Sequence, residues 1–288
     1  MYKIAHISDT HISFNDKNGH GKTLVELLTD IKQRECSHIV ITGDLVENPE
    51  LREFHYVKEI LSHFEILTPE KLSVIPGNHD IFGGAPSSVM FFTFPLTCKE
   101  TDTEKNLENF TETFKDTLPE NRSFPYLKVI ENIAIIGINS MDKWSIDKNP
   151  EGSNGMVSDE DYKKLKKILS SKEIKDKYKI VLIHHHFNRI KLSDEYPAHT
   201  LWLKAVNYKM KLHNKNRLID LFKKEKVNIV LHGHTHVNHI YNLKGVTYVN
   251  SSAACVPLTD DQTKMYNIIS IPGESEPDRI ITVETIRM

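Results

Sequence analysis

Five short segments of the sequence combine side chains that bind transition metals. Aspartate, histidine and asparagine supply carboxylate, imidazole and amide donors, and imidazole-rich sets suit manganese, iron or zinc better than magnesium or calcium. One such segment alone would be read as a polar turn. Five in one chain predict a shared metal site. The segments are Asp9-Thr10-His11, Gly43-Asp44-Leu45-Val46-Glu47, Gly77-Asn78-His79-Asp80, His184-His185-His186 and Gly233-His234-Thr235-His236.

Each of these segments follows an apolar, largely β-branched run that predicts a buried strand. Apolar residues at helical spacing separate the first three runs, which indicates a βαβαβ arrangement. Open α/β sheets bind ligands at the carboxyl ends of their strands. We therefore expect the five segments to meet at one end of a sheet. The runs lie at 3–8, 38–42, 72–75, 179–183 and 228–232.

The rest of the chain completes one mixed α/β domain over residues 1–288, with a β-rich C-terminal half. Apolar periodicity predicts helices at 158–170 and 216–225. Further strands are expected at 133–138, 239–242, 246–249, 265–271 and 280–286.

Two long insertions, 82–125 and 187–214, interrupt this pattern. Long insertions on the ligand side of a sheet are often caps. The first is explained equally well as a peripheral helix that packs on the core.

Composition narrows the classes of partner. The chain has 288 residues with a formal net charge of −2, so no global basic field favours nucleic acid. No apolar run is long enough to cross a membrane, and no targeting pattern begins the chain. The three cysteines lack Cys-x-x-Cys spacing, which suits a reducing compartment. We expect a cytoplasmic protein without a membrane partner.

The five motifs, in this order, resemble those of the calcineurin-like metallophosphoesterases, and no ligand position departs from the pattern. His6-Ile7-Ser8 before Asp9 and the compact length are most similar to the cyclic-nucleotide phosphodiesterase branch. The resemblance implies two mixed β-sheets packed face to face with helices on the outside, a four-layer sandwich. It also implies a cofactor of two divalent or trivalent transition-metal ions, Mn, Fe or Zn.

The resemblance further implies which residues hold the metals. Asp44 would bridge the two ions. Asp9, His11 and His236 would complete one set of ligands, and Asn78, His234 and one histidine of the 184–186 run would complete the other. In the family the second histidine of a His-His pair is the ligand, which indicates His185. Neighbouring side chains of an extended chain point to opposite faces, so His184 and His186 are expected to be packing groups.

Further roles are expected around the metals, and the first of them, that of His79, is implied by the same resemblance. His79 would contact the phosphate or protonate the leaving oxygen, and Asp80 would orient the His79 ring or, alternatively, cap the loop. Glu47 is interpreted as a supporting acid rather than a ligand. Arg189 could bind a phosphate or ribose. Aromatic residues of the insertions could stack on a base; they are Phe91, Phe94, Trp202 and Tyr208.

These residues predict a dinuclear metal-dependent phosphoesterase acting on a small-molecule phosphoester. Two divalent ions, the carboxylates of Asp9 and Asp44 and a bridging hydroxide leave one net positive charge. That charge matches a phosphodiester, so we expect metal-bridged hydroxide attack on a small phosphodiester such as a cyclic nucleotide. Alternatives are a phosphomonoesterase or protein phosphatase with the same site, a DNA nuclease, and a non-catalytic scaffold that kept the fold.

Overall fold

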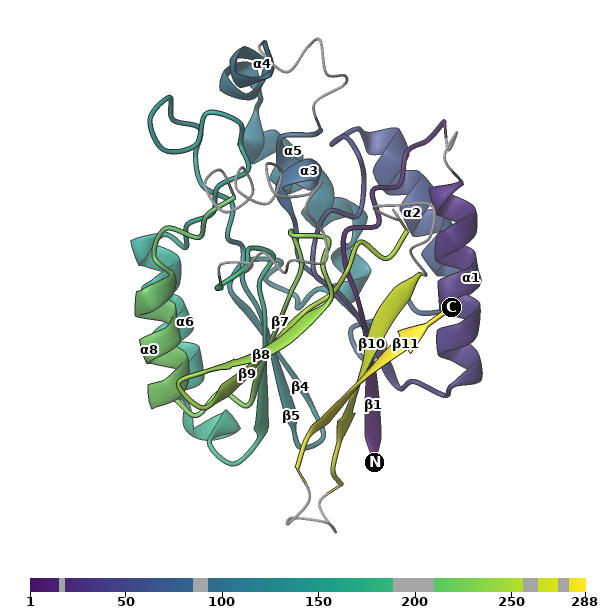
Figure 1. The fold of residues 1–288 in the computed structure, drawn as a ribbon, viewed down its shortest axis with the longest axis vertical. Coiled ribbons are helices and arrows are strands. Elements are labelled where there is room, and N and C mark those ends of the chain that lie inside the picture. The colour runs from purple at the N-terminus through teal and green to yellow at the C-terminus, as the bar shows by residue number, and fades with distance from the viewer. Residues whose placement is uncertain (16–18, 85–92, 189–209, 256–263, 274–279) are drawn as a thin grey trace, which may run out of the picture.

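Two mixed β-sheets form the centre of the computed structural model (Figure 1), which describes residues 1–15, 19–84, 93–188, 210–255, 264–273 and 280–288. The first sheet has the order β11-β10-β1-β2-β3, in which β1, β2 and β3 are parallel and β10 and β11 are antiparallel additions. Its strands are β1 (Tyr2–Ile7), β2 (His38–Ile41), β3 (Leu72–Val74), β10 (Met265–Ile271) and β11 (Thr282–Arg287).

The second sheet has the order β4-β5-β6-β7-β9-β8. Its four inner strands are parallel, while β4 and β8 are antiparallel edge strands. The strands are β4 (Tyr126–Ile130), β5 (Ile133–Gly137), β6 (Tyr178–Leu182), β7 (Ile229–His232), β8 (His239–Leu243) and β9 (Val246–Asn250).

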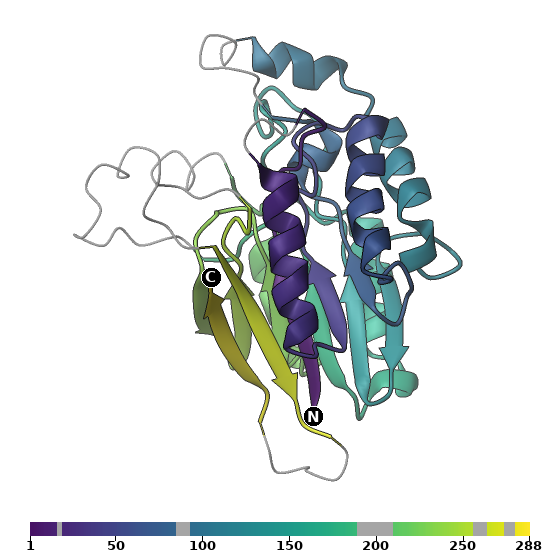
Figure 2. The same ribbon diagram turned by 90° about the vertical axis from the view of Figure 1, so that its right-hand side faces the viewer.

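Helices cover the outer faces of both sheets, as the two perpendicular views show (Figures 1 and 2). On the first sheet lie α1 (His20–Gln33), α2 (Leu51–His63) and α5 (Thr103–Thr113). On the second lie α6 (Asp159–Leu169) and α8 (Lys215–Lys224). The result is the predicted four-layer sandwich. Shorter helices are α3 (Asn78–Ile81), α4 (Phe94–Glu100) and the 3-10 turns η2 (Lys115–Thr117) and η3 (Lys172–Ile174).

The inner strands of the second sheet are buried on both faces. Ile180 and Leu182 of β6 join the cluster that fills the space between the sheets. Val181 and the following Ile183 join the cluster under α6 and α8. Side chains along the end of β6 therefore alternate between the inter-sheet space and the outer helical layer.

Segments 82–125 and 187–214 differ in how far the structure describes them. In the first, the rings of Phe110 of α5 and of Phe114, which follows its last residue, pack on Phe54 of α2 at centroid distances of 5.9 and 6.2 Å. This helix therefore belongs to the periphery of the core. The second segment lies mostly outside the described residues, so its role as a cap stays a prediction. None of the described helices has the length and apolar composition that a membrane span requires.

The sequence analysis did not predict strand β4, because one of its inward side chains is a lysine. Lys128 is 6% exposed, whereas Val129 beside it points outward. The Lys128 ammonium donates to the Leu72 carbonyl (2.6 Å) and the Ser73 hydroxyl (3.1 Å), and the Tyr126 hydroxyl donates to the Val74 carbonyl (3.1 Å). These bonds join edge strand β4 to edge strand β3 of the other sheet.

Replacing Lys128 with methionine is expected to help the protein most at low pH. Burial lowers the pKa of Lys128 from 10.5 to about 7. Below pH 7 the folded wild type bears the full cost of the buried charge, and this cost falls as pH rises from about 7 to 10.5. The advantage of Lys128→Met over wild type should shrink across that window by up to about 1.4 kcal/mol per pH unit.

Urea unfolding of both proteins at pH 6.5, 8 and 9.5 measures this difference. Methionine at the exposed Lys175 provides the matched control, which should show no such trend. A pH-independent difference between wild type and Lys128→Met would contradict a charged, buried Lys128.

Candidate metal centre

The five predicted segments meet where the parallel strands of both sheets end. The amide of Asp9 donates to the Gly43 carbonyl and that of His11 to the Asp44 carbonyl, each at 3.0 Å. The His234 amide donates to the Asp9 carboxylate at 3.0 Å. The amide of Gly233 binds the His184 carbonyl at 3.1 Å. Backbone bonds thus join the loops within each sheet, and the Asp9 carboxylate joins a loop of the first sheet to one of the second.

Backbone conformation at these loops is unusual for side chains of this size. Five predicted ligands have φ values between 45° and 76°, in the left-handed region that non-glycine residues rarely adopt. Such residues cost roughly 1–3 kcal/mol each and gather at functional sites. They are Asp9, His11, Asp44, His234 and His236.

Two glycines make room for the carboxylates. A Cβ on Gly77 would collide with the Asp44 carboxylate, and one on Gly233 would collide with that of Asp9 and with the Ser8 hydroxyl. The glycines of the Gly-Asn-His-Asp and Gly-His-Thr-His motifs are therefore required by close packing around the acids.

Asp9, His11 and His236 form one group of potential ligands, whose donor atoms lie within 4.8 Å of one another. The Nε2 atoms of His11 and His236 are 3.1 Å apart, and His236 Nε2 is 3.5 Å from Asp9 Oδ1. Burial alone would raise the pKa of Asp9, but the His236 imidazole holds it below its usual value.

Asp44, His184 and His234 form a second such group. His184 Nε2 lies 3.3 Å from Asp44 Oδ2, 3.0 Å from His234 Nδ1 and 3.1 Å from Asn78 Oδ1. Asp44 also approaches the first group, with Oδ2 3.9 Å from His11 Nε2. This carboxylate therefore lies between the two groups, where a bridging ligand is needed.

The donor set of the second group calls for a cation. His184 Nδ1 lies 2.8 Å from the Thr42 carbonyl, to which it must donate a proton. A neutral His184 then presents only a lone pair at Nε2, facing the oxygens of Asp44 and Asn78. A metal ion accepts all of these lone pairs. Without one, a proton fills the role: despite burial, Asp44 raises the pKa of His184 to about 9.

The structure places His184, rather than the predicted His185, beside Asp44 and His234. His185 belongs to none of the groups among the described residues; its Nδ1 binds the Ser140 hydroxyl at 2.8 Å. The alternation along β6 explains the difference. Leu182 points between the sheets and Ile183 points outward, so His184 continues the inward series. His186 is buried as well, with its ring 6.0 Å from that of His234.

Alanine at position 184 is expected to remove most of one metal equivalent, whereas alanine at 185 or 186 should leave both equivalents bound. Only His184 places a ring nitrogen against Asp44, Asn78 and His234. Elemental analysis of the three purified variants, with melting temperature as the folding control, measures the effect. Loss of metal only in His185→Ala would restore the original assignment.

His79 forms a third group of potential ligands with His11 and Asp44, at the partly exposed edge of the centre. Its side chain is 23% exposed, and its ring meets the His11 ring edge-on at 4.3 Å. His79 Nδ1 is 3.2 Å from the Glu47 carbonyl and 3.7 Å from Glu47 Oε2. The same carboxylate oxygen lies 3.1 Å from His11 Nδ1. Glu47 thus supports both imidazoles, and it belongs to no ligand group among the described residues.

Asp80 does not orient the His79 ring, contrary to the catalytic role predicted for it. Its Oδ1 accepts from the amides of Leu45 (2.9 Å) and Val46 (3.1 Å), and its Oδ2 accepts from that of Gly77 (2.8 Å). Burial and the Asp44 carboxylate raise the pKa of Asp80 to about 8. The residue is the loop cap that the sequence left as the alternative.

Of the five predicted substrate contacts, the structure describes only Phe94. Phe94 is 8% exposed and packs with Ile81, Phe82 and Cys98, so it offers no stacking face. The other four predicted contacts lie outside the described residues; they are Arg189, Phe91, Trp202 and Tyr208.

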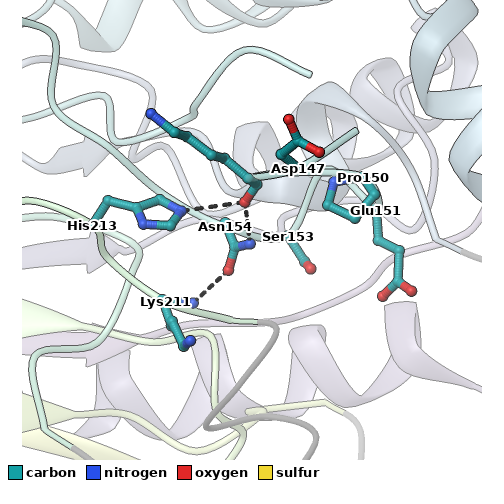
Figure 3. A pocket seen from close by; sticks show the side chains of 8 residues that line it. Asp147, Pro150, Glu151, Ser153, Asn154, Lys211 and His213 are labelled. Carbon is teal, nitrogen blue, oxygen red and sulfur yellow. Dashed lines mark hydrogen bonds between the residues drawn. The ribbon is translucent and has the colours of Figure 1, made fainter. Parts of the chain in front are cut away.

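A separate cavity of about 150 Å³ lies between the loop after β5 and the segment before α8 (Figure 3). Its wall is built by hydrogen bonds, because the Lys148 carbonyl accepts from Asn154 Nδ2 (2.6 Å) and lies 3.2 Å from His213 Nε2. None of its lining residues belongs to the two ligand groups. They are Asp147, Lys148, Pro150, Glu151, Ser153, Asn154, Lys211 and His213.

Comparison with known proteins gives one family and several related folds. The family model described as Calcineurin-like phosphoesterase matches residues 2–238. No curated protein matches the chain. A dimetal phosphatase from Danio rerio is similar in structure, with a TM-score of 0.61, 11% identity, and coverage of 93% of this chain and 92% of that chain.

The purple acid phosphatase PPD1 from yellow lupin (Lupinus luteus) seeds has a TM-score of 0.60 and 14% identity. The match covers 99% of this chain but only 53% of the lupin protein, so the chain spans about half its length. At these identities the two solved structures are evidence for the fold alone.

Proposed function

Because the chain belongs to the calcineurin-like phosphoesterase family, and is therefore a metal-dependent phosphoester hydrolase, we propose that it hydrolyses a small phosphodiester such as a cyclic nucleotide. The observation that carries this proposal is the position of Asp44 between two groups of ligands that together contain only two carboxylates. With two divalent ions and a hydroxide, such a site keeps about one positive charge, which suits the singly charged phosphodiester.

The proposed ligands divide between two metal positions. Asp9, His11 and His236 would hold one ion, Asn78, His184 and His234 the other, and Asp44 both. When bound, the two ions supply Lewis-acid stabilisation of the phosphoryl oxygens and a nucleophile at neutral pH. Imidazole-rich ligation supports manganese, iron or zinc as the metals.

His79 would provide the proton for the leaving oxygen. Because Nδ1 faces the Glu47 carbonyl, it donates its proton there, and only Nε2 is left for transfer. A ring that gives up the Nε2 proton must start as imidazolium, and the Glu47 carboxylate lies 3.7 Å from Nδ1. The exposed position of His79 leaves space for substrate at the metal edge.

A substrate screen of the manganese-loaded protein tests the proposal. Bis(p-nitrophenyl) phosphate and cyclic AMP should be hydrolysed faster than p-nitrophenyl phosphate, and single-stranded DNA should not be degraded. Faster turnover of p-nitrophenyl phosphate would favour a phosphomonoesterase or protein phosphatase. Full metal content without turnover of any phosphoester would refute catalysis altogether.

A further inference from the structure

Phe14 is an exposed aromatic ring in the loop that follows the proposed ligand His11. Its side chain is 52% exposed, and it is the one aromatic among the exposed large apolar residues that the structure describes. It follows His11 by three residues, a length of chain that spans at most about 11 Å. A limit of this size matches the length of a nucleotide, which permits contact between the ring and a base whose phosphate is at the metals.

A buried carboxylate fixes the backbone that carries this ring. Glu53 is 3% exposed, and its Oε1 accepts from the Phe14 amide (3.4 Å) and the Ser13 hydroxyl (3.2 Å). Its Oε2 accepts from the Asn48 amide (2.8 Å). Asn48 follows Glu47, so Glu53 ties the loop after His11 to the loop that supports His11 and His79. Phe14 is thereby held in register with the metal centre.

The ring itself is oriented by two neighbours from the first turns of α2. The Arg52 guanidinium lies 5.6 Å from the ring centroid, and the Tyr56 ring meets Phe14 edge-on at 6.3 Å. Arg52 also pairs with Glu50 at 2.5 Å, which balances its charge. A lone exposed phenylalanine needs no explanation, but one fixed at its backbone and ring is preorganised for a contact.

We propose that Phe14, oriented by Arg52 and Glu53, is the subsite on which the aromatic base of a nucleotide substrate stacks. The inference rests on the proposed phosphodiesterase function and names the class of substrate for that site. Stacking on an aromatic side chain tolerates any base, because every base has a π face. The subsite therefore predicts a preference for nucleotides over phosphoesters without a base, and little choice among bases.

Binding of two ligands that differ only in the base tests this subsite. Titration calorimetry of the manganese-loaded full chain is carried out with AMP and with ribose 5-phosphate. Wild type should bind AMP more tightly than ribose 5-phosphate. Phe14→Leu, which keeps an apolar side chain but has no π face, should weaken AMP binding about five- to tenfold and leave ribose 5-phosphate unchanged. Phe14→Tyr should retain the preference.

Controls separate this outcome from the fate of the proposed function. Val129→Ala, at an exposed apolar residue of β4, should bind both ligands as wild type does. Equal affinity of wild type for the two ligands, or an unchanged preference in Phe14→Leu, would overturn the subsite. Turnover of bis(p-nitrophenyl) phosphate by the same preparation would then show that the phosphodiesterase assignment survives without it.

Discussion

Asp44→Asn is expected to abolish phosphoester hydrolysis and to lower the bound metal below two ions per chain. Asp44 is the residue that approaches both ligand groups, at 3.3 Å from His184 Nε2 and 3.9 Å from His11 Nε2. Asparagine keeps the shape but removes the negative charge that separates two cations. Since metal ions contribute several kcal/mol of transition-state stabilisation, activity should fall by at least about a thousandfold.

The amide would also disturb another hydrogen bond of the same side chain. Asp44 Oδ1 accepts from the His79 amide at 2.8 Å, and an asparagine NH₂ in that place would face a donor. Elemental analysis and turnover of bis(p-nitrophenyl) phosphate measure the two effects. Asp116→Asn, at an exposed acid paired with Lys58, is the control. Two metals per chain with normal turnover in Asp44→Asn would exclude the bridging role.

His79→Asn is expected to slow hydrolysis of cyclic AMP far more than that of bis(p-nitrophenyl) phosphate. A ribose alkoxide needs a proton in the transition state, and a positioned acid contributes roughly 10²- to 10⁴-fold. A p-nitrophenolate leaves without such help because it is a stable anion. Metal content should stay at the wild-type level, since the proposed ligands of both ions are complete without His79, which lies beside His11.

Measuring both substrates on one variant decides between two roles for this histidine. Equal losses would mean that His79 stabilises charge on the phosphoryl oxygens instead. Unchanged rates for both substrates would mean that His79 has no catalytic role and is only part of the loop. His55→Asn, at an exposed histidine of α2, controls for the loss of an imidazole elsewhere on the surface.

The sequence alone determined the family, the fold and most of the proposed centre, and the family match and the arrangement of the sheets confirm the first two. This was possible because each ligand motif directly follows its strand, so local periodicity places it at a strand end. Parallel strands then bring such ends together. The cyclic-nucleotide branch, the metals, the single-domain organisation and the cytoplasmic location stay predictions.

Tertiary structure decided the features that the local sequence pattern does not indicate. Strand β6 is buried on both faces, so its residues do not reveal which side faces the other sheet, and packing alone decides that His184 lies beside Asp44. Asp80 meets backbone amides of the distant Asp44 loop, a contact that its neighbours in sequence do not show.

Contacts between distant segments also explain two features that the sequence analysis did not predict. Lys128 enters the core because the Leu72 carbonyl and the Ser73 hydroxyl of β3 lie opposite it, although nothing in the sequence of β4 indicates these partners. Phe14 stays exposed because Glu53 and Arg52, from a helix almost forty residues later in the chain, hold its loop and its ring in place. The periodicity of apolar residues indicates which helix or strand a residue belongs to. Its role depends on groups that only the folded chain brings within hydrogen-bonding distance.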